Sequence, residues 1–296
     1  MTGGVLVLDK PAGITSFRAV QAVGRILRER KCGHAGTLDP MATGVLPVCV
    51  GRATKIAGYL SEEEKTYEVA FRFGVATDTG DAAGKPVEER PGASAPEPEV
   101  AAALSALTGT FEQVPPAYSA VKVGGVRSYA LARKGKEAPL AARRVTVRDA
   151  RLLSWEGTGF RAQITCSKGF YVRSLSRDFG ERLGVPMTVA ALRRLRVGSF
   201  RIENAVTLEG LEERARRGEA ASLLVPIADA LAHLSRWVVP AIAEAAVRNG
   251  RLAGPWVIGR ASAERGRIAL LVTEAMEPLA LAGRDATGIW KILRGL

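Results

Sequence analysis

The densest group of residues that could do chemistry lies between Gly33 and Leu46, in the segment GHAGTLDPMATGVL. It combines His34, Asp39 and three glycines within 14 residues. Pro40 holds the preceding aspartate in an extended or turn conformation, so this loop can present one carboxylate at a fixed angle. A carboxylate that a nearby cation keeps ionised can act as a nucleophile or general base. The plain structural alternative is an aspartate that caps a turn.

A second group lies between Cys166 and Arg177, in the segment CSKGFYVRSLSR. Cations interleaved with aromatic rings suit contact with an RNA backbone combined with base stacking. The alternative is an ordinary amphipathic helix with exposed arginines and one aromatic side chain in the core. The cations and aromatic residues of this group are Lys168, Arg173, Arg177, Phe170 and Tyr171.

Several other chemistries lack their sequence patterns. No G-x-x-x-x-G-K-[ST] occurs and no G-x-G-x-x-G follows a strand, which argues against an ATP or dinucleotide site. No G-x-S-x-G is present, which argues against a serine nucleophile on a sharp turn. Three scattered cysteines and two histidines argue against a disulfide framework, a zinc site or a histidine-rich metal site.

Hydrophobic periodicity predicts the elements that hold the first group. Gly4–Lys10 is a short apolar run that ends in charges, which predicts a buried strand. Thr15 or Ser16 can cap a helix that runs to about Leu27. The segment Lys31–Leu46 is rich in Gly, Thr, Pro and Asp, and it predicts an irregular loop.

The elements around the second group follow the same reasoning. Thr66–Phe73 alternates in polarity and predicts a half-buried strand whose apolar face begins at Tyr67, a core tyrosine by default. Phe160–Cys166 predicts another such strand, and Val172–Leu183 predicts a helix with one apolar side. The basic segment Leu192–Phe200 fits either a strand or a loop.

The C-terminal part of the chain has a different pattern. Thr207 begins a short predicted helix that ends near Gly218. After Trp237 the sequence changes to short apolar runs separated by glycines, such as 256–258 and Ile268–Val272. This pattern predicts a small β-rich C-terminal module.

Composition sets the class of protein. The chain has 296 residues, of which 47% are hydrophobic and 24% charged, as expected for one or two globular domains. Its longest uncharged stretches, such as Pro40–Gly51, run only 12 residues, which is too short for a membrane span. Asp9 and Lys10 interrupt the apolar core that a secretory signal needs. We therefore expect a protein of the reducing cytoplasm.

Charge is unevenly distributed along the chain. The net charge is +12, with +5 over residues 1–60, −6 over 61–100 and +11 over 101–200. Two basic blocks around an acidic one indicate a surface that meets a polyanion, unless the arginines are simply solvated. Phosphate contacts would supply affinity without sequence specificity.

Taken together, these segments resemble the tRNA pseudouridine synthase B family. The resemblance runs continuously and in order over roughly the first 200 residues. The pattern H-x-G-x-L-D-P-x-A-x-G-x-L, which begins at His34, is highly specific. The other matching stretches are LDKPAGITS from Leu8, KTYEVAFRFGVATDTGDAAG from Lys65, PPAYSAVKVGGVRSYALARKG from Pro115, CSKGFYVRSLSRDFGERLG from Cys166 and LRRLRVGSF from Leu192.

The resemblance implies a fold and a reaction. The fold is a mixed α/β (α+β) pseudouridine synthase domain over residues 1–236, with a mixed, largely antiparallel sheet flanked by helices. Residues 237–296 would form a small β-barrel module of the PUA type that binds RNA. The reaction is conversion of the T-loop uridine 55 of tRNA to pseudouridine after base flipping. It implies no metal, no cofactor, no membrane and no protein partner, in a monomer that binds the T stem-loop.

The resemblance also assigns roles to residues. Asp39 matches the essential aspartate, and Arg173 the arginine that pairs with it. Tyr67 matches the tyrosine that stacks on uracil and is a candidate base for the carbon-5 proton. The resemblance implies three kinds of substrate contact. Tyr171 and Leu192 match pocket-wall positions, and His34 matches the histidine that enters the T-loop. Lys10 and Lys168 are the two lysines of the matching stretches that would contact substrate.

Three alternatives stay open on the sequence alone. One is a guide-RNA-dependent synthase that modifies ribosomal RNA. Another is a tRNA-folding factor whose catalysis is dispensable, and a third is a hydrolase with an aspartate nucleophile. The acidic block is expected to face solvent, although Asp78 and Asp81 in the stretch TDTGD could instead bear on the site.

Overall fold

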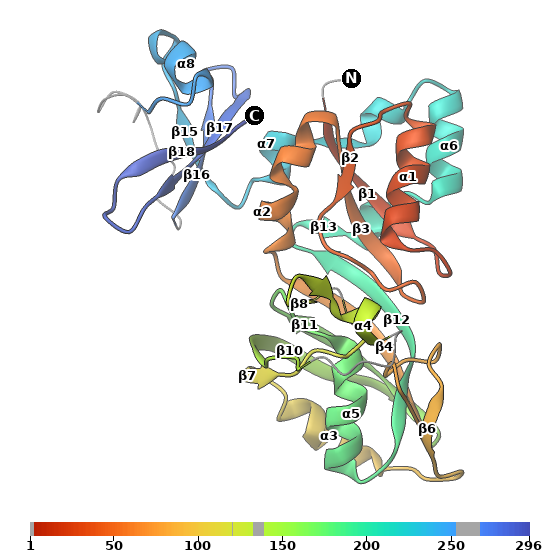
Figure 1. Ribbon diagram of the computed structural model, residues 1–296. Coiled ribbons are helices and arrows are strands. Elements are labelled where there is room, and N and C mark those ends of the chain that lie inside the picture. The colour runs from red at the N-terminus through yellow and green to blue at the C-terminus, as the bar shows by residue number, and fades with distance from the viewer. Residues whose placement is uncertain (1–2, 120, 133–138, 253–266) are drawn as a thin grey trace.

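A single large sheet organises most of the chain (Figure 1). The computed structural model describes residues 3–119, 121–132, 139–252 and 267–296. Along the sheet the strand order is β14-β1-β3-β12-β4-β11-β10-β7, with β2 on β3 and β13 on β12. The strands are β1 (Gly4–Lys10), β2 (Cys32–His34), β3 (Thr43–Val50), β4 (Lys65–Phe73), β7 (Gly109–Gln113), β10 (Arg143–Trp155), β11 (Gly159–Cys166), β12 (Met187–Val197), β13 (Phe200–Arg201) and β14 (Leu224–Pro226).

The predicted mixed, largely antiparallel sheet is confirmed. Every pairing in this sheet is antiparallel except that of β3 with β12. The parallel pairing is short and joins Arg193 to Thr43 and Arg194 to Gly44. It therefore places the start of β3 beside the middle of β12, at the centre of the sheet.

Helices cover the sheet in two groups. α1 (Ser16–Ile26) and α6 (Leu208–Arg216) contact each other over the β1–β3 end of the sheet. α3 (Glu97–Ser105) and α5 (Val172–Leu183) contact each other over β10 and β12 in the other half, and Figure 1 shows the two groups apart. The remaining short elements are α2 (Ala57–Ser61), α4 (Ser128–Ala132), α7 (Ile227–Ala230), the β5 (Val75–Thr77) and β6 (Pro86–Glu89) pair, and the β8 (Lys122–Val123) and β9 (Val126–Arg127) pair.

The predicted helix ends are confirmed by their caps. The Thr15 side chain accepts a hydrogen bond from the Arg18 amide (3.2 Å), so α1 begins where the sequence predicts. Thr207 caps α6 in the same way through the Gly210 amide (3.1 Å). α5 ends at Gly184, which adopts φ 65°, a conformation that glycine adopts without steric cost.

The core explains why β1 has no polar face. Leu6 and Leu8 lie in one apolar cluster, and Val5 and Val7 lie in a second cluster across the sheet. A strand that is buried on both sides reads as a continuous apolar run. The first cluster continues along the sheet to the packed rings of Phe71, Phe160 and Phe179.

One prediction near the site needs correction, and one open alternative is resolved. The predicted irregular loop Lys31–Leu46 contains β2 and the first residues of β3, because β2 pairs antiparallel with β3. Neither local periodicity nor composition marks so short a strand. The segment Leu192–Phe200, which fitted either a strand or a loop, is mostly strand, since β12 runs from Met187 to Val197 and β13 begins at Phe200.

The C-terminal residues form the predicted small β-module. β15 (Ser235–Val238), β16 (Ile268–Val272), β17 (Pro278–Arg284) and β18 (Trp290–Gly295) make a four-stranded sheet beside α8 (Ala241–Arg248). The described strands form an open sheet rather than a closed barrel, and the run 256–258 lies outside the described residues. No helix in the described part of the chain is long and apolar enough to span a membrane.

Candidate active site

Hydrogen bonds hold the loop between β2 and β3 in place on the N-terminal side of Asp39. The buried Ser16 hydroxyl accepts a hydrogen bond from the Leu38 amide (2.8 Å) and donates one to the Leu38 carbonyl (3.0 Å). Ser16 is the first residue of α1, so the helix fixes the residue that precedes Asp39. The side chain of Asp39 stays about one third exposed (33%), which leaves its carboxylate open to a substrate.

Lys10 fastens the other side of the loop. Its fully buried ammonium donates to the carbonyl oxygens of Pro11 (2.7 Å), Ile14 (2.9 Å) and Pro40 (3.4 Å). Burial lowers the pKa of Lys10 to about 8, although the Asp39 charge opposes the shift. The contact of Lys10 with substrate stays a prediction, while these bonds give it a role in holding the loop.

Arg173 binds the Asp39 carboxylate through two parallel hydrogen bonds. Nε donates to Oδ2 (2.8 Å) and Nη2 donates to Oδ1 (3.1 Å). This fork matches the carboxylate plane, and it is the strongest form of charge-assisted hydrogen bond between side chains. The structure thus brings together two residues that lie 134 positions apart in the sequence.

Arg173 makes two further hydrogen bonds. Nη1 donates to the Thr79 carbonyl (3.0 Å) and Nη2 to the Tyr118 carbonyl (2.8 Å). The Asp81 carboxylate lies 3.6 Å from Nε. Arg173 is only 5% exposed, so these partners are what make burial of its charge tolerable.

Asp81 follows the alternative left open for it in the sequence, because it does not face solvent. It is buried, and its Oδ1 accepts hydrogen bonds from the Thr79 hydroxyl (2.7 Å) and the Ala83 amide (3.0 Å). The turn that contains Gly80 and Asp81 passes close to α5, and a Cβ on Gly80 would lie 2.6 Å from the Arg173 carbonyl oxygen. Gly80 has φ 73°, so both space and backbone require glycine here.

Arg194 is a second buried arginine, placed behind the catalytic loop. Its guanidinium donates to the carbonyls of Val45 (2.7 Å), Thr37 (3.2 Å) and Gly36 (3.1 Å). On β12 it lies directly opposite Tyr67 of β4. Arg194 therefore ties the backbone of the loop to the strand that carries Tyr67.

Burial raises the pKa of Tyr67 above its usual value of 10.0. The charge of Arg194 and its hydrogen bond to the phenol oppose that shift. The hydroxyl is therefore neutral near pH 7, yet the cation beside it would stabilise negative charge that develops there. Tyr67 is 9% exposed, and its strand position is the predicted one.

For two more residues, contact with the substrate base stays a prediction. Leu192 is almost buried on β12, opposite Val69. The side-chain amide of Gln113 holds the backbone of Tyr171, since its Oε1 accepts from the Tyr171 amide (2.8 Å) and its Nε2 donates to the Tyr171 carbonyl (3.1 Å). Burial raises the pKa of the Tyr171 hydroxyl, which keeps it neutral.

His34 lies at the end of β2, five residues before Asp39. Its Nδ1 is buried without a hydrogen-bond partner among the described residues. Burial, reinforced by the charge of Arg194, lowers the pKa of His34 below 6.5. The imidazole is therefore a neutral, planar ring at physiological pH.

Lys168 differs from the other predicted residues because it belongs to the surface. Its side chain is more than half exposed, and its ammonium pairs with Glu62. It forms no hydrogen bond or ion pair with Asp39 or Arg173 among the described contacts. Its contact with substrate stays a prediction.

Sequence reasoning missed Arg194 as a site residue. The available signal was that Leu192 and Arg194 are two positions apart and so share one face of a strand. That signal could be used only after the segment was known to be a strand. Within the described ranges, no group of three or more His, Cys, Asp or Glu side chains is arranged as metal ligands.

Comparison with known proteins gives consistent matches. Residues 24–172 match the family model described as "TruB family pseudouridylate synthase (N terminal domain)". Residues 173–241 match the model described as "tRNA pseudouridylate synthase B C-terminal domain". Together these models span Asp39, Tyr67 and Arg173, while Lys10 and Ser16 lie before residue 24.

Individual relatives are similar over most of their length. A tRNA pseudouridine synthase B of Chromohalobacter salexigens is 45% identical over 265 residues, which cover 90% of this chain and 86% of the relative. Its namesake in Bacillus subtilis is 42% identical over 258 residues, covering 85% and 84%. A crystal structure of a Cbf5-Nop10-Gar1 complex contains a chain with a TM-score of 0.77 and 29% identity, covering 96% of this chain and 79% of that one.

Proposed function

This chain belongs to the TruB family of pseudouridylate synthases, and we propose how its site carries out the family reaction on one uridine of tRNA. It is an isomerase that forms pseudouridine in tRNA. The proposed target is uridine 55 in the T-loop. The observation that carries the assignment of Asp39 is its bidentate pairing with the buried Arg173, which leaves the carboxylate one third exposed.

The reaction exchanges one glycosidic bond for another. The bond between N1 of uracil and C1′ of ribose breaks, the base rotates, and a bond forms between carbon 5 and C1′. Carbon 5 loses its proton and N1 gains one, so no oxidant or reductant is consumed. Asp39 starts this sequence as the nucleophile, because Arg173 keeps its carboxylate ionised and oriented. The bond that the carboxylate forms to the nucleotide breaks again before the product leaves, which restores the free carboxylate.

Tyr67 has two proposed tasks. Its ring supplies a stacking face for the uracil. Its phenolate, formed when the hydroxyl loses its proton to solvent and stabilised by the adjacent Arg194, accepts the carbon-5 proton and returns to the neutral phenol. Tyr171 and Leu192 line the rest of the base site. A uridine inside a folded loop reaches such a site only if it leaves its stack. The neutral ring of His34 is suited to fill the gap.

The charge distribution supports a partner of high negative charge. The basic blocks over residues 1–60 and 101–200 would follow the phosphates of the T stem-loop, with Lys168 among them. We assign catalysis to residues 1–236 and further RNA contact to the β-module of residues 237–296. We propose that the enzyme acts as a monomer in the cytoplasm.

The test is release of tritium from a tRNA transcript that carries tritium at carbon 5 of its uridines. A bond at carbon 5 must expel that hydrogen, whereas binding or hydrolysis of the RNA does not. We expect about one equivalent per tRNA, none with Asp39→Asn, and unchanged release with Asp149→Asn, an exposed aspartate on β10.

RNA affinity separates chemistry from binding in the same experiment. Asp39→Asn keeps the size of the side chain, so the variant should bind tRNA as the wild type does. Tight binding by the wild type without tritium release would reject the isomerase assignment and favour a tRNA-folding factor or a guide-dependent enzyme. A large loss of affinity in Asp39→Asn would contradict a mainly chemical role for this residue.

A further inference from the structure

An exposed aromatic ring lies near the catalytic loop but outside the site described above. Phe17 is in the first turn of α1, and its side chain is 66% exposed. It borders a groove of about 810 Å³, which is also lined by Gln21, Arg25 and Arg28. Phe17, Gln21 and Arg25 follow helical spacing and so form a single stripe, roughly 12 Å long at 1.5 Å per residue, and Arg28 lies just beyond the end of the helix.

The groove is strongly basic. Arg25, Arg28 and Arg30 line it and are exposed. None of the three forms an ion pair within the described part of the chain. Glu29 is the one acidic residue among those that line the groove, and its carboxylate accepts a bond from the Lys31 amide (2.8 Å). Unpaired cations around an aromatic ring are suited to a ligand that has both phosphates and planar bases.

Arg28 occupies a backbone position that favours glycine. It has φ 53° and follows the C-cap of α1. The Glu29 amide donates to the Gly24 carbonyl (2.9 Å) and the Arg28 amide to the Arg25 carbonyl (3.2 Å), which is the Schellman pattern. An arginine here has a backbone cost that glycine avoids, so its presence indicates a use for the side chain.

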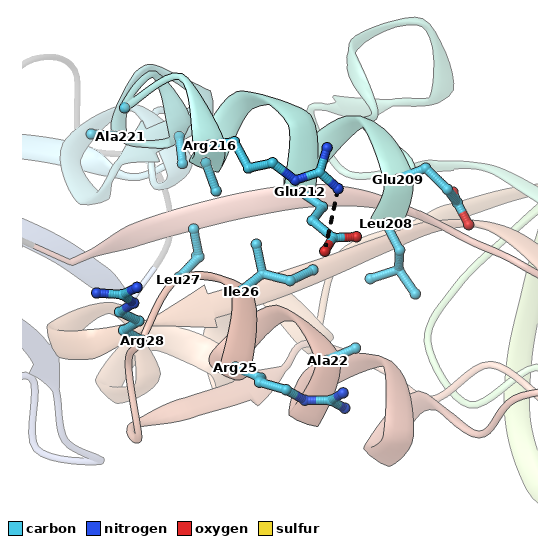
Figure 2. A pocket seen from close by; sticks show the side chains of 13 residues that line it. Ala22, Arg25, Ile26, Leu27, Arg28, Leu208, Glu209, Glu212, Arg216 and Ala221 are labelled. Atoms are coloured by element: carbon cyan, nitrogen blue, oxygen red, sulfur yellow. Dashed lines mark ion pairs between the residues drawn. The ribbon is translucent and has the colours of Figure 1, made fainter.

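A neighbouring groove shares Arg25 and Arg28 with the first but differs in charge. It lies between α1 and α6, encloses about 890 Å³, and has Ile26 and Leu27 between the two helices (Figure 2). Its lining also includes Glu209 and Glu212, and Glu212 pairs with Arg216 (3.4 Å). Because two glutamates lie among its arginines, this second groove suits a polyanion less well than the first.

The basic groove also reaches the active-site loop. Its lining ends at Cys32, the first residue of β2, and β2 ends at His34. We propose that this groove binds a single-stranded segment of the substrate RNA, with one unstacked base on Phe17 and phosphates on Arg25, Arg28 and Arg30. The proposal rests on the proposed function, because it takes the substrate to be RNA.

The aromatic contact is tested by affinity for a tRNA transcript, in the Asp39→Asn background that prevents turnover. Stacking of one base on an aromatic side chain corresponds to a roughly 5- to 150-fold change in affinity, so Phe17→Ala should weaken binding within that range. Phe17→Leu should weaken it similarly, and Phe17→Trp should retain it. The control is Val87→Ala, which removes an equally exposed (66%) apolar side chain. Wild-type affinity in Phe17→Ala would overturn the proposal.

Arg28→Gly tests the phosphate contact without harming the fold. The change relieves the positive φ, so the melting temperature should not fall below that of the wild type. RNA affinity should fall nonetheless, and the slope of log affinity against log salt should decrease by about one. An unchanged affinity and slope would overturn the phosphate contact.

Tritium release by the otherwise wild-type enzyme keeps the two proposals separate. If it releases tritium while Phe17→Ala binds normally, the groove proposal alone fails. If it releases none while Phe17→Ala and Arg28→Gly still weaken RNA binding, the proposed function fails and the groove stands as an RNA site.

Discussion

Arg173→Lys tests whether the fork on Asp39 is what prepares the nucleophile. Lysine keeps the positive charge but has a single nitrogen, so it can replace at most one of the two bonds to the carboxylate. One charge-assisted hydrogen bond is worth about 1.5–3 kcal/mol. We therefore expect the single-turnover rate to fall roughly 10- to 150-fold, at about 1.4 kcal/mol per factor of ten.

Stability should change along with the rate. Arg173 also donates to the carbonyls of Thr79 and Tyr118 from two different nitrogens, and the single nitrogen of a lysine cannot occupy both positions, so we expect one of these bonds to be lost. A buried carbonyl without a partner costs about 1–3 kcal/mol. Denaturant unfolding should show a loss of that order, while the affinity for tRNA should change little, because the altered bonds lie within the protein.

The assay is tritium release under single-turnover conditions with enzyme in excess. Its matched control is Arg182→Lys, the same substitution at an exposed arginine on the same helix, which should behave as the wild type. A rate for Arg173→Lys within about threefold of the wild type, in a protein that has lost stability as expected, would refute the role of the fork and leave Arg173 a structural residue.

Three further predictions follow from the geometry. Gly44→Ala should lower the free energy of unfolding by at least about 2 kcal/mol in denaturant titrations. The reason is that Gly44 has φ 101° and that the Cβ of the alanine would lie 2.2 Å from the Arg194 carbonyl oxygen. Wild-type stability would contradict the close approach of β3 and β12. Burial lowers the pKa of His34 in the folded state, so the protein takes up a proton on unfolding below pH 6.5. As the pH is lowered below 6.5, the free energy of unfolding should therefore decrease more steeply in the wild type than in His34→Asn. Identical pH slopes would show that the pKa of the imidazole is not shifted. Arg144→Ala, at an exposed cation of the second basic block, should weaken tRNA binding and reduce its salt slope by about one, and an unchanged slope would exclude this residue from the RNA face.

Local sequence determined most of the individual elements around the site. The apolar run of β1, the Thr15 cap of α1 and the alternation of β4 each depend on neighbouring residues, so periodicity and capping chemistry were sufficient to predict them. The specific pattern from His34 onward also identified Asp39 before any partner was visible. These features could be read directly because every residue involved lies within a few positions of the others.

What only the tertiary structure decided is which side chains meet. Asp39 and Arg173 are separated by 134 positions, and Arg194 and the Gly36 carbonyl by 158. Composition left open whether Asp81 faces solvent with the rest of the acidic block or bears on the site, and the fold buries it beside Arg173. Such contacts depend on which strands become neighbours in the sheet. No local pattern encodes that choice, because the pairing of β12 with β3 and β4 is stabilised by packing across the whole domain.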